Sequence, residues 1–494
     1  MIKGHCSIEG TQRYAERFPD LSFQPLAPIG WQTSGIGFGA YRVDQEINIH
    51  YQAMEQALKS GMNVIDTAAN YFEGGSERLV GDCVLELIKE GVLARDEVAV
   101  VSKGGYIQGS FYEKLRQDQQ AYPEIVWMDN NLAHCIHPQF LKDQLDLSLT
   151  RLGMSCIDVY LIHNPEYFLM NLEKEGAVQA VAQSQYYDRL QAAFTYLETE
   201  VKNGRIQYYG VSSNTFPSND SKMTHTCLSR MMKGLPRKHH FRMIQCPLNL
   251  YESDAVLGAA DGRAPLLETA QEKGVAVMVN RPLNALKGTQ LMRLAEYTLK
   301  DEPKTDQEVQ VLLGEFEEVE THLVHLLEDE GSVESLLVHI NLNERIRTLW
   351  TQEMSFAQWK TILIEYLLPH IEILVSGLAE KLEMTKDRGE HIESYIRHFN
   401  HLIHVISEWL KEQSNHRAMT IKDQLRQVDD EIDPRLKLSQ LAVQVLRSTP
   451  GVGVTLVGMR ESHYVTDISA AISLERLPEW DLSKWSEIKA YLAG

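Results

Sequence analysis

The sequence of 494 residues is poor in positive charge and has no long hydrophobic run. Lysine and arginine number 48 against 68 aspartate and glutamate residues, which gives a formal net charge of −20. This acidic surplus offers no general attraction to phosphate backbones or anionic lipid, so no nucleic-acid partner is expected. No stretch approaches the ~20 uninterrupted apolar residues of a membrane helix, so no membrane partner is expected either.

Cysteine is also scarce: six residues are scattered along the chain, and none forms a CxxC pair. In a chain of this length, such cysteines are typical of reduced, mostly buried thiols in a cytosolic protein. The first nine residues contain an acid and lack the apolar core of a signal peptide. The sequence therefore predicts a soluble, cytoplasmic protein.

Short β-branched runs alternate with amphipathic helical stretches from Gly35 to Val279, and a last such unit follows much later. Eight strands are predicted: Thr33–Phe38, Asn63–Asp66, Val98–Ser102, Ile157–Ile162, Ile206–Val211, Met243–Gln245, Ala276–Val279 and Val452–Val457. Short apolar runs rich in valine and isoleucine are expected of buried parallel strands. Eight βα units favour an α/β fold of the closed (β/α)8 type, the TIM barrel. The segment Tyr14–Trp31, rich in proline, is predicted to be a hairpin or plug.

Residues 288–436 break this alternation and show long helical periodicity, as in Leu312–Glu328, Trp359–Leu368 and His391–Lys411. We predict an all-α insertion of four or five helices between strands seven and eight. Residues 1–287 and 437–494 then form the barrel. Pro369 is expected to end or kink its helix. The run Asp301–Glu330 holds eleven acids and one lysine, which indicates a solvated helix face.

Side chains capable of acid–base chemistry follow three of the predicted strands. Asp66 and Tyr71 follow the second strand, Lys103 the third and His163 the fourth. Each alone also fits a structural role, but the carboxyl ends of barrel strands meet at the rim where active sites gather. A lysine leaving a buried strand needs a counter-charge, which Asp66 supplies. The lysine is expected to lower the pKa of Tyr71 and so favour proton transfer to a carbonyl that receives a hydride.

The order and spacing of these and further motifs resemble the aldo-keto reductase family. The motifs are Asp66-Thr-Ala-x-x-Tyr71 with Gly74-Gly75-Ser76-Glu77, Ser102-Lys103, Ser148-Leu149-x-Arg151-Leu152-Gly153 with Ile157-Asp158, Leu161-Ile162-His163-x-Pro165, Gly204-Arg205-Ile206, Gly210-Val211-Ser212-Ser213-Asn214 and Gln245. The resemblance covers about residues 35–283 and resumes at about 438–473. It implies an oxidoreductase of the aldo-keto reductase or alcohol dehydrogenase type. Such an enzyme interconverts a carbonyl and an alcohol of a small molecule by hydride transfer with NADP(H) or NAD(H).

The resemblance also implies roles for single residues. Tyr71 becomes the general acid–base, Lys103 and Asp66 tune it, and His163 positions the substrate carbonyl. The cofactor is expected to lie across the carboxyl rim. Its nicotinamide end is expected at Gly39, Ala40, Tyr41, Ser213, Asn214, Gln245 and Asn280. Its adenosine phosphates are expected at Gly458, Met459, Arg460, His463 and Asp467.

Two departures from the family pattern follow strand seven. Asn280 stands where the family usually has an aromatic that stacks on the nicotinamide. Arg281 is expected either to pair with the pyrophosphate or to form a salt bridge to the insertion, and both alternatives stay open. Arg460 is the only nearby cation for a 2′-phosphate, so NADP(H) is favoured over NAD(H) only by this residue.

Competing patterns are weaker. The run Gly35-Ile-Gly37-Phe-Gly39 lacks the GxGxxG spacing of a Rossmann loop. Four histidines of the insertion, at 391, 398, 401 and 404, share one helix, but no Glu-x-x-His motif accompanies them, so no metal is predicted. The alternative function is a non-catalytic or weakly catalytic NADP-binding regulatory protein on this scaffold. A protein partner or self-association through the insertion stays open.

Overall fold

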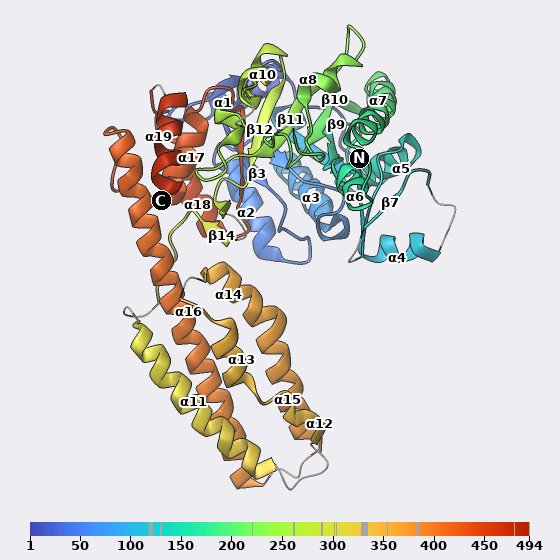
Figure 1. Cartoon of the computed structure of the whole chain (residues 1–494). Helices are drawn as coiled ribbons and strands as arrows, with labels where there is room; N and C mark the ends of the chain where they lie inside the picture. Colours follow the sequence, from blue (N-terminus) through green and yellow to red (C-terminus); the bar gives the residue numbers. More distant parts are fainter. Residues whose placement is uncertain are drawn as a thin grey trace. The chain divides into compact units, whose positions relative to one another are not determined.

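The computed structural model describes residues 1–117, 122–128, 131–219, 221–259, 262–287, 290–300, 302, 304–327, 334–352, 354–381, 385–478 and 480–493. Its centre is a closed barrel of eight parallel strands (Figure 1). In ring order these are β3 (Ile36–Gly39), β4 (Val64–Asp66), β5 (Ala99–Gly104), β9 (Ile157–His163), β10 (Ile206–Ser212), β11 (Phe241–Pro247), β12 (Ala276–Asn280) and β15 (Val454–Gly458). All eight predicted strands are present, and the predicted (β/α)8 barrel is confirmed.

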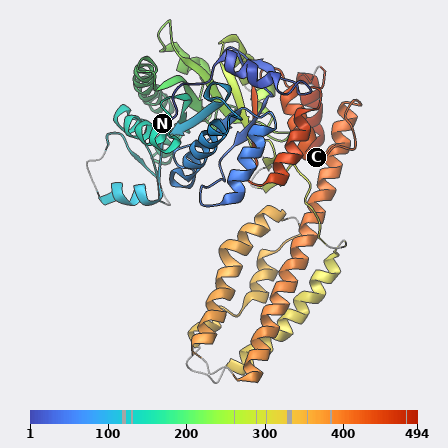
Figure 2. The same ribbon diagram turned by 180° about the vertical axis from the view of Figure 1, so that it is seen from behind.

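Helices surround this barrel, as Figures 1 and 2 show from opposite sides. They are α2 (Asn48–Lys59), α3 (Gly75–Lys89), α5 (Pro138–Leu152), α6 (Tyr167–Lys174), α7 (Gln179–Lys202), α8 (Leu228–Lys233), α9 (Asp254–Leu257), α10 (Leu266–Glu272), α17 (Leu438–Ser448), α18 (Ser462–Ile472) and α19 (Leu482–Ala493). Local sequence sets their ends. In α5, for example, His137 accepts a hydrogen bond from the Gln139 backbone N–H, Pro138 occupies the first turn, and Gly153 ends the helix with φ of 62°.

The amino end of the barrel is closed by the predicted hairpin. It consists of β1 (Gln24–Leu26) and β2 (Trp31–Thr33) and follows helix α1 (Ile8–Glu16). Trp31, with its hairpin neighbours Leu26 and Ile29, belongs to one buried cluster with residues such as Val64 and Val454 from the first part of the strands. The opposite end, formed by the carboxyl ends of the strands, is where barrel active sites lie.

Additional structure follows strand β5 on that carboxyl side. A small antiparallel sheet contains β6 (Tyr106–Gln108), β7 (Val126–Trp127) and β8 (Leu132–His134), with α4 (Gly109–Gln117) between β6 and β7. The 3₁₀ turn η1 (Tyr71–Gly74) comes directly after β4, and the 3₁₀ turn η2 (Arg95–Glu97) comes directly before β5. Within η1, Phe72 and Glu73 adopt left-handed backbone angles, with φ of 48° and 50°.

The chain divides into two compact units: residues 1–283 with 425–494, and residues 284–424. The second unit contains a hairpin of β13 (Asn284–Lys287) and β14 (Gln290–Arg293), followed by helices. These are α11 (Asp306–Leu327), α12 (Glu334–Leu337), α13 (Leu342–Leu349), α14 (Phe356–Ile362), α15 (Leu368–Lys381) and α16 (Lys386–Val428), which runs past the unit boundary. The described part thus has six helices against the four or five predicted, because the one-turn α12 carries no periodicity to detect.

The second unit has a hydrophobic core of its own. Phe316 of α11, Trp359 of α14 and Tyr395 and Leu402 of α16 belong to one buried cluster, to which α12, α13 and α15 also contribute. The acidic run predicted as a solvated face is exposed at positions 308, 315, 317 and 318 but buried at Glu320, so that prediction is wrong for Glu320. Asp301 and residues 328–330 of this run, like Gly288 at the predicted boundary, lie outside the described residues.

Pro369 does not end its helix. A π-helical turn, η4 (Leu363–Leu367), joins α14 to α15, and the helix continues past Pro369 to Lys381. The wider turn changes the hydrogen-bond register just before the proline, whose ring and missing N–H an α-helix accommodates poorly. The joined stretch Phe356–Lys381 is long and apolar enough to cross a membrane by length and composition, with only 17% of its most apolar window buried. Lys360, Glu365 and Glu372 interrupt this stretch, so it is not the uninterrupted apolar run whose absence the sequence analysis noted.

Candidate active site

The structure brings the four predicted catalytic residues together at the carboxyl rim. Asp66 ends β4, Lys103 is the second-last residue of β5, His163 ends β9, and Tyr71 opens the turn η1. Lys103 Nζ lies 2.8 Å from Asp66 Oδ2 and 3.2 Å from the Tyr71 hydroxyl. The rings of Tyr71 and His163 meet edge to face, with centroids 5.8 Å apart. All four side chains are buried.

Lys103 is the central group of the site. Its ammonium is fully buried and donates to Asp66 Oδ2, to the Thr67 backbone carbonyl at 2.8 Å and to the Tyr71 hydroxyl. Burial lowers the pKa of Lys103, but the Asp66 carboxylate and the Tyr71 oxygen raise it by more, so it lies above its ordinary value. The lysine therefore keeps its charge beside the tyrosine.

Tyr71 differs from the sequence expectation. Burial raises the pKa of its hydroxyl, and the Lys103 ammonium offsets this only in part, because the Asp66 carboxylate acts in the opposite direction. Lys103 lowers the pKa of Tyr71, as predicted, but burial outweighs this effect, so the predicted net lowering is wrong. Tyr71 carries its proton at neutral pH, which is the form that a proton donor needs.

His163 is neutral in this environment. Burial lowers its pKa well below the ordinary value, and the nearby Lys103 and His134 add to the effect. His134 Nε2 lies 2.7 Å from the His163 backbone carbonyl, and the Tyr106 ring packs edge to face at 4.6 Å from the imidazole. The Nδ1 atom of His163 is buried without a hydrogen-bond partner in the described structure. A neutral imidazole offers one donor and one acceptor, so it can donate to a carbonyl oxygen.

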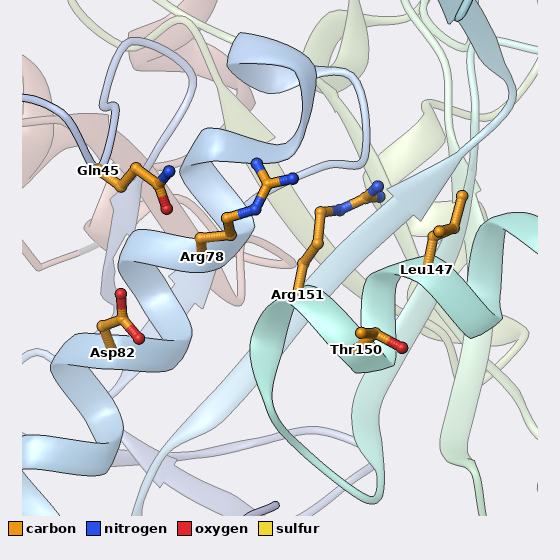
Figure 3. A pocket seen from close by; sticks show the side chains of 6 residues that line it. All are labelled: Gln45, Arg78, Asp82, Leu147, Thr150 and Arg151. Carbon is orange, nitrogen blue, oxygen red and sulfur yellow. The ribbon is translucent and has the colours of Figure 1, made fainter.

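A buried ion pair between Glu77 and Arg151 contacts strand β5 through Ser102. Glu77 accepts hydrogen bonds from Ser102 Oγ at 2.5 Å and from Arg151 Nε at 2.6 Å. Arg151 of α5 and Arg78 of α3 both line a groove of 390 Å³ (Figure 3). Ser102 directly precedes Lys103, so this pair fixes the backbone from which the catalytic lysine extends.

The residues predicted for the nicotinamide side line the same rim. Gly39 pairs in the barrel with both Asp66 and Gly458. The backbone N–H of Ala40 donates to the Asp66 carbonyl at 2.8 Å. Tyr41 is 62% exposed and its ring lies edge to face with Tyr71 at 5.1 Å, so it forms an open wall beside the proton donor.

The residues predicted to hold the nicotinamide carboxamide have partners within the protein. Ser213 Oγ lies 3.1 Å from Thr215 Oγ1, and the backbone N–H of Asn214 donates to Glu166 Oε1 at 2.8 Å. Glu166 is a site residue that sequence reasoning missed. The only sign of it in the sequence is an acid three residues after His163. Burial raises the pKa of Glu166 to about 7, and its Oε2 is buried without a partner in the described structure.

The two residues that depart from the family pattern are Asn280, the last residue of strand β12, and Arg281, which follows it. Asn280 Nδ2 donates to Gln245 Oε1 at 3.3 Å, while Asn280 Oδ1 is buried without a partner in the described structure. Arg281, with φ of 58°, pairs with Glu252 at 3.3 Å. Glu252 belongs to the same unit as Arg281.

The residues predicted for the adenosine phosphates lie on and after β15. Gly458 ends this strand, Met459 is buried, Arg460 is half-buried, and His463 is exposed in the first turn of α18. The Asp467 carboxylate accepts hydrogen bonds from Ser439 Oγ and Gln440 Nε2, at 2.6 and 3.2 Å, and so ties α18 to the start of α17.

The rim fits a ligand that carries amide hydrogen-bond groups. His163 Nδ1, Glu166 Oε2 and Asn280 Oδ1 are buried polar atoms without protein partners in the described structure. Buried polar groups are normally paired, so three of them at one rim indicate a polar ligand. Among the described residues, no group of three histidine, cysteine or acidic side chains is arranged to hold a metal.

Barrel and site together define a class of protein: a barrel enzyme whose rim holds a buried lysine, aspartate and tyrosine beside a neutral histidine. The family model described as "Aldo/keto reductase family" matches residues 35–340, and the chain belongs to this family. Named relatives of the chain include reductases that use NADH or NADPH.

The matches to individual relatives cover smaller parts of the chain than the family model does. The chain is 30% identical over 169 residues to an NADH-specific methylglyoxal reductase of Escherichia coli strain K12, which covers 32% of this chain and 47% of the relative. It is 26% identical over 190 residues to an NADPH-dependent D-xylose reductase of Meyerozyma guilliermondii, covering 37% and 50%. The chain thus spans about half the length of the curated relatives it matches. A solved aldo-keto reductase, AKR11C1 from Bacillus halodurans, aligns over 95% of this chain and 96% of its own, with 13% identity and a TM-score of 0.48.

Proposed function

We propose that the protein interconverts an aldehyde or ketone and the corresponding alcohol of a small molecule, with Tyr71 as the general acid–base. The observation that supports this most strongly is the Lys103 ammonium, fully buried between Asp66 and the Tyr71 hydroxyl. A buried lysine with three hydrogen bonds beside a protonated phenol is the arrangement that a proton donor to a carbonyl needs.

In this proposal, a bound nicotinamide cofactor supplies the hydride to the carbonyl carbon. Tyr71 gives its phenolic proton to the carbonyl oxygen as that oxygen gains negative charge. Lys103 stabilises the phenolate that remains, and Asp66 holds Lys103 in place. Neutral His163 donates a hydrogen bond that orients the carbonyl oxygen. Oxidation of an alcohol follows the same path in reverse.

We favour NADP(H) over NAD(H) because Arg460, half-buried at the start of α18, is a cation near the position expected for a 2′-phosphate. The names of the relatives include both an NADH-specific and an NADPH-dependent reductase. The discriminating variant is Arg460→Ala, which should weaken binding of NADPH by about 10-fold or more while changing that of NADH little. Equal losses for the two cofactors would contradict the preference.

We also propose a cytoplasmic location and a small-molecule carbonyl or alcohol as the substrate. All six cysteines are free thiols, and five of them are buried, as expected of a protein in a reducing compartment.

The direct test is the variant Tyr71→Phe, assayed with a panel of aldehydes and ketones that includes methylglyoxal and D-xylose. Loss of a general acid should lower kcat by about 100-fold or more. Fluorescence titration should show that NADPH still binds. Tyr51→Phe, on the outer helix α2, is the matched control and should behave as the wild type. Unchanged turnover in Tyr71→Phe would overturn the proposed mechanism.

A second candidate is a regulatory NADP-binding protein that turns over no carbonyl. Asn280 in place of the stacking aromatic and the separate helical unit, residues 284–424, favour it. Cofactor binding by the wild type without turnover of any member of the panel would support this alternative.

A further inference from the structure

The Asp66 carboxylate is held by two groups from different parts of the barrel. Lys103 donates to Oδ2, and Gln245 Nε2 donates to Oδ1 at 2.8 Å. Strands β4 and β11 are not neighbours, since β12, β15 and β3 stand between them in the ring. The Gln245 bond therefore crosses the barrel interior, and it occupies the oxygen that Lys103 leaves open.

The orientation of the Gln245 amide is set by what lies behind it. Its Oε1 accepts from Ser212 Oγ at 3.1 Å and from Asn280 Nδ2 at 3.3 Å. If the amide turned over, Oε1 would face the Asp66 carboxylate and Nε2 would face Asn280 Nδ2. Both contacts would then be repulsive, whereas the Ser212 hydroxyl fits either orientation. Asn280 and Asp66 thus select the same orientation from opposite ends.

The barrel register places Asn280 where it can do this. Gln245 pairs with Met278, and Asn280 lies two residues further along β12, so its side chain lies on the same face of the sheet. An aromatic ring at this position, as the family pattern expects, has no donor so close to its backbone. The departure from the family pattern thus replaces a ring with a hydrogen-bond donor aimed at Gln245.

We propose that Asn280 and Gln245 form a positioning relay that holds the Asp66 carboxylate against Lys103 and so keeps Tyr71 ready to donate its proton. This inference deepens the proposed function and rests on it for its role in catalysis. In this relay both are positioning residues, because they reach Lys103 and Tyr71 through Asp66, and the test without cofactor separates this role from the cofactor contacts expected of them.

The physical effect of the relay is electrostatic. Burial raises the pKa of Asp66, while Lys103 and the hydrogen bond from Gln245 lower it. The titratable groups that face Asp66 are Lys103 on β5 and Tyr71 on η1. Without the Gln245 donor, Oδ1 is a buried acceptor with no partner, so the neutral carboxylic acid gains relative to the carboxylate.

The test uses the full-length protein without cofactor, labelled with ¹³C at aspartate carboxyls, and follows Asp66 by NMR as a function of pH. The Asp66→Asn variant assigns the signal. Gln245→Leu should raise the apparent pKa of Asp66 by about one unit or more, as expected for a lost hydrogen bond to a charged group. Asn280→Leu should raise it in the same direction by less. Met278→Leu, on the same face of β12, is the control and should leave the titration unchanged.

Activity adds a second readout. The acidic limb of the pH profile of kcat should move to higher pH in both relay variants, in the order found by NMR. If a leucine variant does not fold, Gln245→Ala and Asn280→Ala serve the same purpose. An Asp66 titration that is unchanged in both variants would overturn the relay whether or not the protein is active. A wild type without turnover would overturn the proposed function but leave the NMR result to decide the relay.

Discussion

At the scale of single residues, the site depends on burial as much as on residue type. The sequence places an acid, a lysine, a tyrosine and a histidine at the rim, and the structure brings them into contact. What sequence reasoning predicted incorrectly is the direction of the Tyr71 pKa. That direction depends on how much water the fold removes and on how far Asp66 neutralises Lys103, and both are properties of the folded chain.

The buried pair Lys103–Asp66 gives the first prediction at this scale. Lys103→Met leaves a buried carboxylate without its cation, which should lower the free energy of unfolding by about 3 to 5 kcal/mol. The double variant with Asp66→Asn should recover part of this loss. Lys59→Met breaks the exposed pair with Glu55 and should change stability by less than about 1 kcal/mol. Urea denaturation measures all three, and equal effects of the buried and exposed variants would contradict the account.

Glu166 gives a prediction about pH. Its folded pKa of about 7 lies above the ordinary value of 4.5, so the protonated carboxyl stabilises the fold, and this contribution is lost as the pH rises through 7. Glu166→Gln cannot titrate. The stability of this variant relative to the wild type should therefore increase by about 2 to 3 kcal/mol between pH 5 and pH 8. Thermal unfolding at both pH values measures it, and a difference independent of pH would contradict the assignment.

At the scale of elements, the strands were predictable because each is a short, β-branched, apolar run that alternates with helical periodicity. The strand ends, and with them the catalytic residues, followed from that pattern. Other features needed the folded structure. The tie between Gln245 and Asp66 joins residues 179 positions apart in the sequence, and no local pattern encodes it. The continuous helix through Pro369 depends on a π-helical turn that side-chain periodicity does not reveal.

The buried Glu320 gives the prediction for this scale. Its carboxyl accepts hydrogen bonds from the backbone N–H groups of Leu342 and Asn343, at the start of α13, and from the Tyr395 hydroxyl. Glu320→Ala leaves the buried backbone N–H of Asn343 without an acceptor and removes one acceptor of Leu342 and of Tyr395, which keep the Ile340 carbonyl, so it should destabilise the helical unit by about 1 to 3 kcal/mol. Glu317→Ala, three residues away and 64% exposed, should have an effect below about 1 kcal/mol. Chemical denaturation followed by circular dichroism distinguishes these outcomes, and equal effects would contradict the assigned role.

At the scale of the whole molecule, the chain is a barrel interrupted by a helical unit with a separate core. The length of the chain alone suggested about three domains at ~150 residues each. The family match across residues 35–340 and the return of the last strand at β15 explain why one barrel accounts for most of it.

Two separate cores predict two unfolding events. Differential scanning calorimetry should resolve two transitions or one asymmetric transition that fits two components. Lys103→Met should lower the Tm of one component only, and Glu320→Ala should lower that of the other. A single two-state transition that both variants shift equally would contradict independent cores.

The most direct test of the central claim is the rate of NADPH oxidation in a single turnover, measured by stopped flow with the best carbonyl substrate of the panel. We predict that Tyr71→Phe lowers this rate constant by about 100-fold or more while the Kd for NADPH stays within about two-fold of the wild type. The same rate constant in wild type and Tyr71→Phe would contradict the account.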